Sequence, residues 1–137
     1  MEQAFPRELG ALDAVFDFVE RFIASERLGE ATAFAVKLAV EELFTNLVRH
    51  NTGGRDRIEV GLELVDDRLV VRLDDFDVEP VEIDQQTPAG TDLPLDRRAI
   101  GGLGIHLVKS IFDALTYEYH EGTLRVTATK HLEDTHV

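Results

Sequence analysis

The chain has 137 residues, 44% of them hydrophobic, which is enough for one domain with a buried core. It contains no cysteine, which excludes a disulfide scaffold, a thiol nucleophile and a cysteine-ligated metal. Its formal net charge of −13 argues against nucleic acid as the main partner, because neutralising phosphates requires clustered lysine and arginine.

The sequence predicts neither a signal peptide nor a membrane-spanning segment. Its amino-terminal residues lack a basic stretch followed by an apolar run, and no apolar run approaches membrane-spanning length. We therefore expect one cytoplasmic domain over residues 1–137 that does not contact a membrane and has a frayed tail at 131–137.

The first 54 residues predict a short strand and two helices. The segment 5–9 is short and extended, which is compatible with a strand. Apolar residues then recur at spacings of three and four over residues 9–25, as is typical of an amphipathic helix. After a break at Gly29, a second helix is predicted over residues 30–50, and residues 51–54 provide residues that end helices.

The remaining residues predict two pairs of strands separated by a long loop and a third helix. The loop, about residues 78–100, loses periodicity and collects prolines and acids, as functional lids do. The glycine-rich segment 101–104 then opens a helix that runs to about residue 114. Strands are predicted at 58–64, 69–73, 115–119 and 124–130. This order predicts an α+β fold, a two-layer sandwich with helices on one face of a mixed, mainly antiparallel sheet.

Two polar residues of the second predicted helix are candidates for chemistry. Glu42 and Asn46 are four residues apart, so they share a face at the border of the apolar stripe. A carboxylate and an amide there suit holding a hydrated Mg²⁺ and orienting a hydroxyl for proton removal. Taken alone, the pattern is more often that of ordinary polar residues beside a core face.

Two further segments have features of a nucleotide site. Glycines at the start of a helix, as in Gly101-Gly-Leu-Gly104, let the backbone amides approach a phosphate. The spacing is neither that of a Walker A loop nor that of a dinucleotide-binding fingerprint. Asp74, at the end of a strand, could accept a hydrogen bond from an exocyclic amine such as adenine N6. Each segment also has an ordinary explanation, as a loop end before a helix and as surface acids.

In combination, these features resemble the Bergerat ATP-binding fold of the GHKL superfamily. The likeness is greatest to its RsbW-type branch of anti-sigma factor serine/threonine kinases. Glu42-Leu-Phe-Thr-Asn46 is similar to the N box of that family, and residues 101–113 are similar to its glycine box. The resemblance covers residues 5–130, and the glycine box is its most specific part.

The resemblance implies roles for individual residues. It implies that Glu42 is the general base for a serine hydroxyl, that Asn46 binds Mg²⁺, and that Asp74 reads adenine. Arg98, or its neighbour Arg97, would reach the terminal phosphate. The residues whose backbone would contact the phosphates of ATP are Gly102, Leu103, Gly104, Ile105 and His106.

The implied function is an Mg-ATP-dependent kinase that regulates a sigma factor and phosphorylates a STAS-domain anti-anti-sigma protein. Such proteins are often homodimers. A second reading is a nucleotide-binding module that sequesters a partner without phosphorylating it, because Phe76 stands where the family usually has a glycine. A third is an ATPase domain from a histidine kinase, which the lack of a preceding phosphoacceptor helix pair disfavours.

Overall fold

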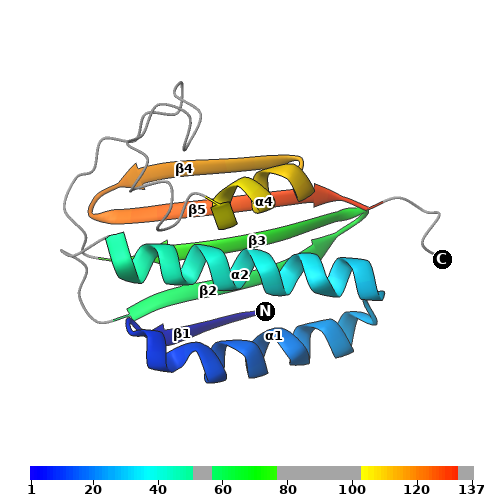
Figure 1. The fold of residues 1–137 in the computed structure, drawn as a ribbon, viewed down its shortest axis with the longest axis horizontal. Coiled ribbons are helices and arrows are strands. Elements are labelled where there is room, and N and C mark those ends of the chain that lie inside the picture. Colours follow the sequence, from blue (N-terminus) through cyan, green and yellow to red (C-terminus); the bar gives the residue numbers. More distant parts are fainter. Residues whose placement is uncertain (51–56, 77–102, 133–137) are drawn as a thin grey trace.

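The structure is a computed structural model that describes residues 1–50, 57–76 and 103–132. The predicted helix stop at 51–54, the lid at 78–100, Arg97, Arg98 and Gly102 lie outside the described residues, as does most of the predicted tail. Figure 1 shows the elements in chain order: β1 (Glu2–Pro6), the short helix η1 (Leu9–Ala11), α1 (Leu12–Glu26), α2 (Glu30–His50), β2 (Arg57–Val65), β3 (Arg68–Asp75), α4 (Leu103–Ile111), β4 (Ala114–His120) and β5 (Thr123–His131).

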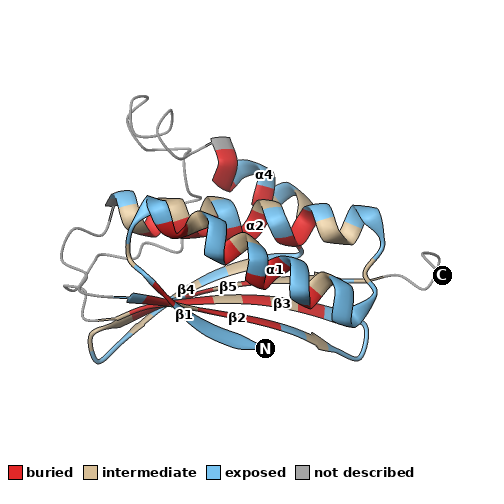
Figure 2. Ribbon diagram, turned by 90° about the horizontal axis from the view of Figure 1, so that it is seen from below, coloured by how far each residue is buried: buried red, intermediate tan, exposed pale blue. Residues whose placement is uncertain are grey.

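The described residues form two layers, as the sequence predicts. One layer is a five-stranded sheet in the order β1-β2-β3-β5-β4. The helices all lie on one face of this sheet, and its other face is uncovered by them (Figure 2). All four pairings among the described strands are antiparallel. The sequence predicts a mixed sheet, but the described strands include no parallel pair.

The first strand lies earlier in the chain than the 5–9 segment predicted from the sequence. It spans Glu2–Pro6, and Phe5 pairs with Ile58 of β2. Phe5 is buried and packs edge-to-face on Phe18 of α1, with ring centroids 5.6 Å apart. The chain then turns into η1, so residues 9–11 belong to the helical entry into α1. Burial of Phe5 therefore anchors the strand at its carboxyl end.

Alternation along the strands builds the core between the layers. Every second residue of β2 and β3 faces the helices, and helix α2 supplies the opposing apolar stripe along its middle. Each of these residues is at most 2% exposed, and their burial supplies the main driving force for folding. The set is Ile58, Val60, Leu62, Leu69, Val71, Leu73, Val36, Val40, Leu43 and Leu47.

Charged side chains occupy the uncovered face of the sheet. Arg72 of β3 bridges Glu2 of β1 at 2.6 Å and Glu59 of β2 at 3.1 Å. Its guanidinium lies over Gly61, where a Cβ atom would come within 2.8 Å of Cζ. This face is therefore organised by ion pairs, whereas the opposite face is organised by apolar packing. None of the described helices is both long and apolar enough to cross a membrane.

Candidate functional site

The carboxylate of Glu42 lies against the first turn of α4. A Cβ atom built on Gly104 would overlap the carboxyl carbon and both carboxylate oxygens of Glu42. Gly104 is buried, and α2 runs beside α4 over the sheet (Figure 1). Two segments more than 50 residues apart in the sequence therefore meet at this point. The unpaired N–H groups at the amino end of a helix, together with its dipole, favour negative charge.

The environment of Glu42 suits a carboxylate that accepts a proton. Burial raises the pKa of the Glu42 carboxyl above its ordinary value, and the negative charge of neighbouring Glu41 raises it further. The positive charge of Arg49 opposes this increase. A carboxylate with a raised pKa is a stronger base near neutral pH. Glu41 itself is exposed, so it acts on Glu42 through charge only.

Asn46 follows Glu42 by about one helical turn and is half-buried at the same border of α2. Within the described residues, no group of three or more histidine, cysteine, aspartate or glutamate side chains could hold a metal ion. An Mg²⁺ ion needs few protein ligands when phosphate oxygens supply others, so one amide oxygen fits this ion.

The structure does not bring Asp74 to the side of the sheet where Glu42 lies. Asp74 is on the uncovered face, where it accepts hydrogen bonds from Arg72 Nε at 3.1 Å and Arg125 Nε at 2.7 Å. It also lines a depression of about 430 Å³ on that face, together with Phe76. The physical reason is the period of two along β3. Leu73 faces the helices, so the next side chain points the other way.

The next residue, Asp75, lies under the helices. It is fully buried, and Arg7 donates to its two oxygens, from Nε to Oδ1 at 3.0 Å and from Nη2 to Oδ2 at 3.2 Å. Nη2 of Arg7 also donates to the main-chain oxygen of Leu47 in the last turn of α2 at 2.9 Å. The alternation Leu69, Val71, Leu73 could have identified Asp75. No local signal could have identified Arg7, which is 68 residues away.

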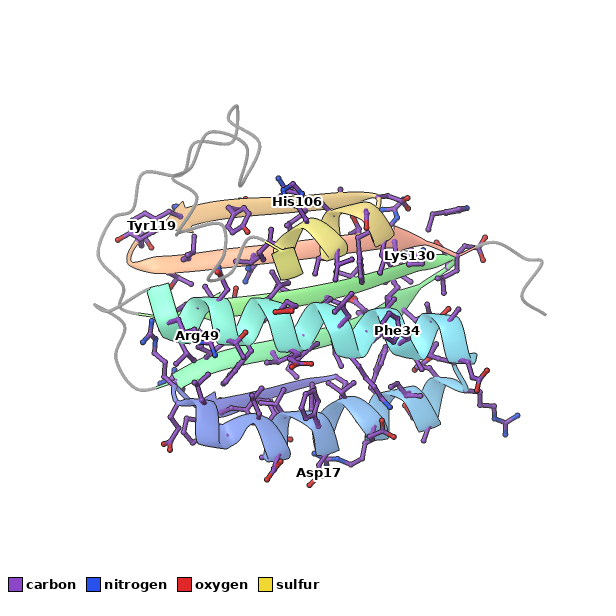
Figure 3. All side chains as sticks on the ribbon, viewed as in Figure 1. Asp17, Phe34, Arg49, His106, Tyr119 and Lys130 are labelled. Atoms are coloured by element: carbon purple, nitrogen blue, oxygen red, sulfur yellow. The ribbon has the colours of Figure 1, made fainter. Side chains whose placement is uncertain are left out.

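The first turn of α4 is held by its apolar side chains. Ile105 and Val108 are buried in the core, which fixes how the helix lies beside α2. His106 is exposed, and Figure 3 shows it on the side of α4 away from α2. Of the residues predicted to contact phosphate, those from Leu103 to His106 contribute main-chain groups at the start of this helix. The imidazole of His106 does not point toward Glu42.

Comparisons with known proteins bear on the family of this chain. Residues 5–130 match the family described as histidine kinase-like ATPase domain. The chain is 34% identical to "Serine-protein kinase RsbW" of Listeria monocytogenes serotype 4a (strain HCC23), over 74% of this chain and 68% of that relative. It is 30% identical to the proteins of the same name from Bacillus velezensis (strain FZB42) and Bacillus subtilis (strain 168), over 71% of this chain and 63% of each.

Proposed function

The chain belongs to the histidine kinase-like ATPase family, and from this premise we propose that it binds Mg-ATP and transfers the γ-phosphoryl group to a serine or threonine of a partner protein. Relatives that are named serine-protein kinases support the choice of acceptor. The observation that carries the proposal is the position of the Glu42 carboxylate beside the amino end of α4. Phosphoryl transfer needs a base next to a group that binds phosphate.

The chemical roles follow from this juxtaposition. The main-chain N–H groups at the start of α4 bind phosphate oxygens, and Asn46 holds the Mg²⁺ ion. The ion would neutralise charge on the phosphates. Glu42 accepts the proton of the acceptor hydroxyl while the hydroxyl oxygen forms a bond to the γ-phosphorus and the bond to the β–γ bridging oxygen breaks. Most of the catalysis is positioning and charge stabilisation.

We propose that Asp75, and not Asp74, accepts the hydrogen bond from the adenine base. Asp75 lies on the helix side of the sheet, and Asp74 is held on the other side by Arg72 and Arg125. Each oxygen of an ionised carboxylate can accept more than one hydrogen bond, but Asp75 is fully buried, so contact with adenine N6 requires the side chains that cover it to move. With Asp75 in this role, the position at which the family usually has a glycine corresponds to residue 77 and not to Phe76.

The proposed partners are a sigma factor and a STAS-domain anti-anti-sigma protein, whose serine or threonine would be the phosphate acceptor. The proposed assembly is a homodimer. These proposals are supported by the resemblance of residues 42–46 and 101–113 to the RsbW-type branch. Incubation with STAS proteins from the same cell, followed by phosphate-transfer and gel-filtration measurements, tests them.

A second candidate function is a module that sequesters its partner without phosphorylating it. The Arg7–Asp75 ion pair favours it, because the carboxylate assigned to adenine is already engaged. Calorimetry with Mg-ATP, followed by a phosphate-transfer assay, separates the two candidates. Absence of ATP binding at micromolar concentrations rejects the kinase, and ATP binding without transfer to a partner favours the sequestering module.

The variant that tests the kinase chemistry is Glu42→Ala, with Glu41→Ala as its matched control. We expect Glu42→Ala to lower the rate of transfer by about 10²–10⁴-fold, the usual contribution of a general base, and to leave ATP affinity within about threefold. Glu41→Ala should retain transfer, because its side chain is exposed. Equal loss in both variants contradicts the role of Glu42, and phosphate on a histidine of this chain would indicate a histidine kinase.

A further inference from the structure

We propose that Gly104 is a positioning residue for Glu42, and that its lack of a side chain reserves the space in which the Glu42 carboxylate lies. This proposal rests on the proposed function for its catalytic consequence, although the steric part stands without it. The observation is that a single Cβ atom on Gly104 would overlap three atoms of the Glu42 side chain at once.

The backbone does not explain a glycine at this position. Gly104 is the second residue of helix α4 and does not have a positive φ, unlike Gly122 in the β4–β5 turn, where φ is 86°. In a helix, alanine is the better residue, because glycine loses more conformational freedom on folding. At Gly29, by contrast, an added Cβ would meet no atom within 4 Å. The three heavy atoms nearest to an added Cβ all belong to Glu42, so contact with Glu42 restricts the side chain at 104 in addition to the approach of a phosphate.

Buried side chains on both helices oppose a movement that would admit a Cβ atom. On α2, the neighbours Leu43 and Phe44 are at most 1% exposed, so the helix is fixed in the core. On α4, Ile105 and Val108 are buried in the same core. The carboxylate is the end of a flexible side chain, so it must yield and turn away from α4. An alanine at 104 thus removes the base from the amino end of α4 without removing either group.

A double-mutant cycle in thermal unfolding tests the steric part without any nucleotide. We expect Gly104→Ala to raise Tm less in the wild-type background than the helix preference of alanine alone predicts, because the Glu42 carboxylate must turn away from α4. In a Glu42→Ala background the same substitution should raise Tm, because the overlap is gone and alanine favours the helix. Gly29→Ala is the control and should change Tm equally in both backgrounds, because an added Cβ there meets no atom within 4 Å. Equal effects of Gly104→Ala in both backgrounds would overturn the proposal.

Kinetics test the positioning part. Gly104→Ala should lower kcat for phosphate transfer at least ~10-fold, because the base is displaced. Replacing Glu42 by the shorter aspartate should then raise kcat in the Gly104→Ala background. An unchanged kcat, or a large rise in KM alone, would contradict the positioning role. A wild-type chain without transfer activity would reject the proposed function, and the thermal cycle would still decide the steric part.

Discussion

The Arg7–Asp75 ion pair makes a strong prediction about stability. Replacing Arg7 by alanine leaves Asp75, which is fully buried, without its two charged hydrogen bonds. It also removes the donor to the Leu47 carbonyl at the end of α2. Removing one partner of a buried ion pair costs about 3–5 kcal/mol, because the buried Asp75 carboxylate loses the hydrogen bonds that the guanidinium donates. The lost donor to the carbonyl adds about 1 kcal/mol. This sum is comparable with the whole stability of a small domain, about 5–15 kcal/mol.

Urea unfolding followed by circular dichroism measures this cost. Lys37→Ala is the control, because Lys37 pairs with Glu20 at 2.6 Å while both side chains are about half exposed. Such a pair is worth about 0–1 kcal/mol. The double variant Arg7→Met, Asp75→Leu should lie within about 1–2 kcal/mol of the wild type, since apolar replacement removes both charges together. The reasoning fails if Arg7→Ala costs no more than Lys37→Ala.

Three other predictions concern the two faces of the sheet and the proposed base. Asp75→Asn should lower ATP affinity in calorimetry by about 10–100-fold, a loss of about 1–3 kcal/mol. Asp74→Asn should change ATP affinity less than threefold. A larger loss for Asp74→Asn than for Asp75→Asn would reject the assignment of Asp75. Glu41→Gln removes a charge that raises the pKa of Glu42. The base is active when ionised and is lost as pH falls through its pKa, so the acid limb of the pH–rate profile should move to lower pH; a shift upward would contradict this. Gly61→Ala should cost about 1 kcal/mol in urea unfolding, by displacing the arginine that lies over it, and should leave ATP affinity unchanged; a more stable variant would refute the contact.

Much of the fold was predictable because its hydrophobic pattern is local. The second helix was predicted at 30–50 and spans Glu30–His50, since its apolar stripe keeps the helical period throughout. The strands at 57–65 and 68–75 follow from simple alternation. The strand near the amino terminus was predicted too late, because Phe5 is the one residue of Glu2–Pro6 that is buried. One buried position does not define a period.

The candidate site was less predictable, because its groups meet only through the fold. The spacing of Glu42 and Asn46 indicates a shared helix face, but nothing local in the sequence says that Gly104 lies against Glu42. Choosing Asp75 over Asp74 required continuing the alternation of Leu69, Val71 and Leu73 to its next position, residue 75. Arg7, which pairs with Asp75, comes from the amino-terminal end of the chain, 68 residues away, and contacts at that separation have no local signature.

The contacts of Arg7 have a consequence for folding kinetics. Its guanidinium donates hydrogen bonds to Leu47, 40 positions further along the chain, and to Asp75, 68 positions further along. These bonds close large loops, so they are costly in entropy when they form early in folding. We expect them to form after the rate-limiting step, once the sheet and α2 are assembled. Loss of Arg7 would then act chiefly on the unfolding limb of a chevron plot and leave the refolding rate nearly unchanged. Faster unfolding would also make the native domain more sensitive to a protease that cleaves the opened form before the domain can refold.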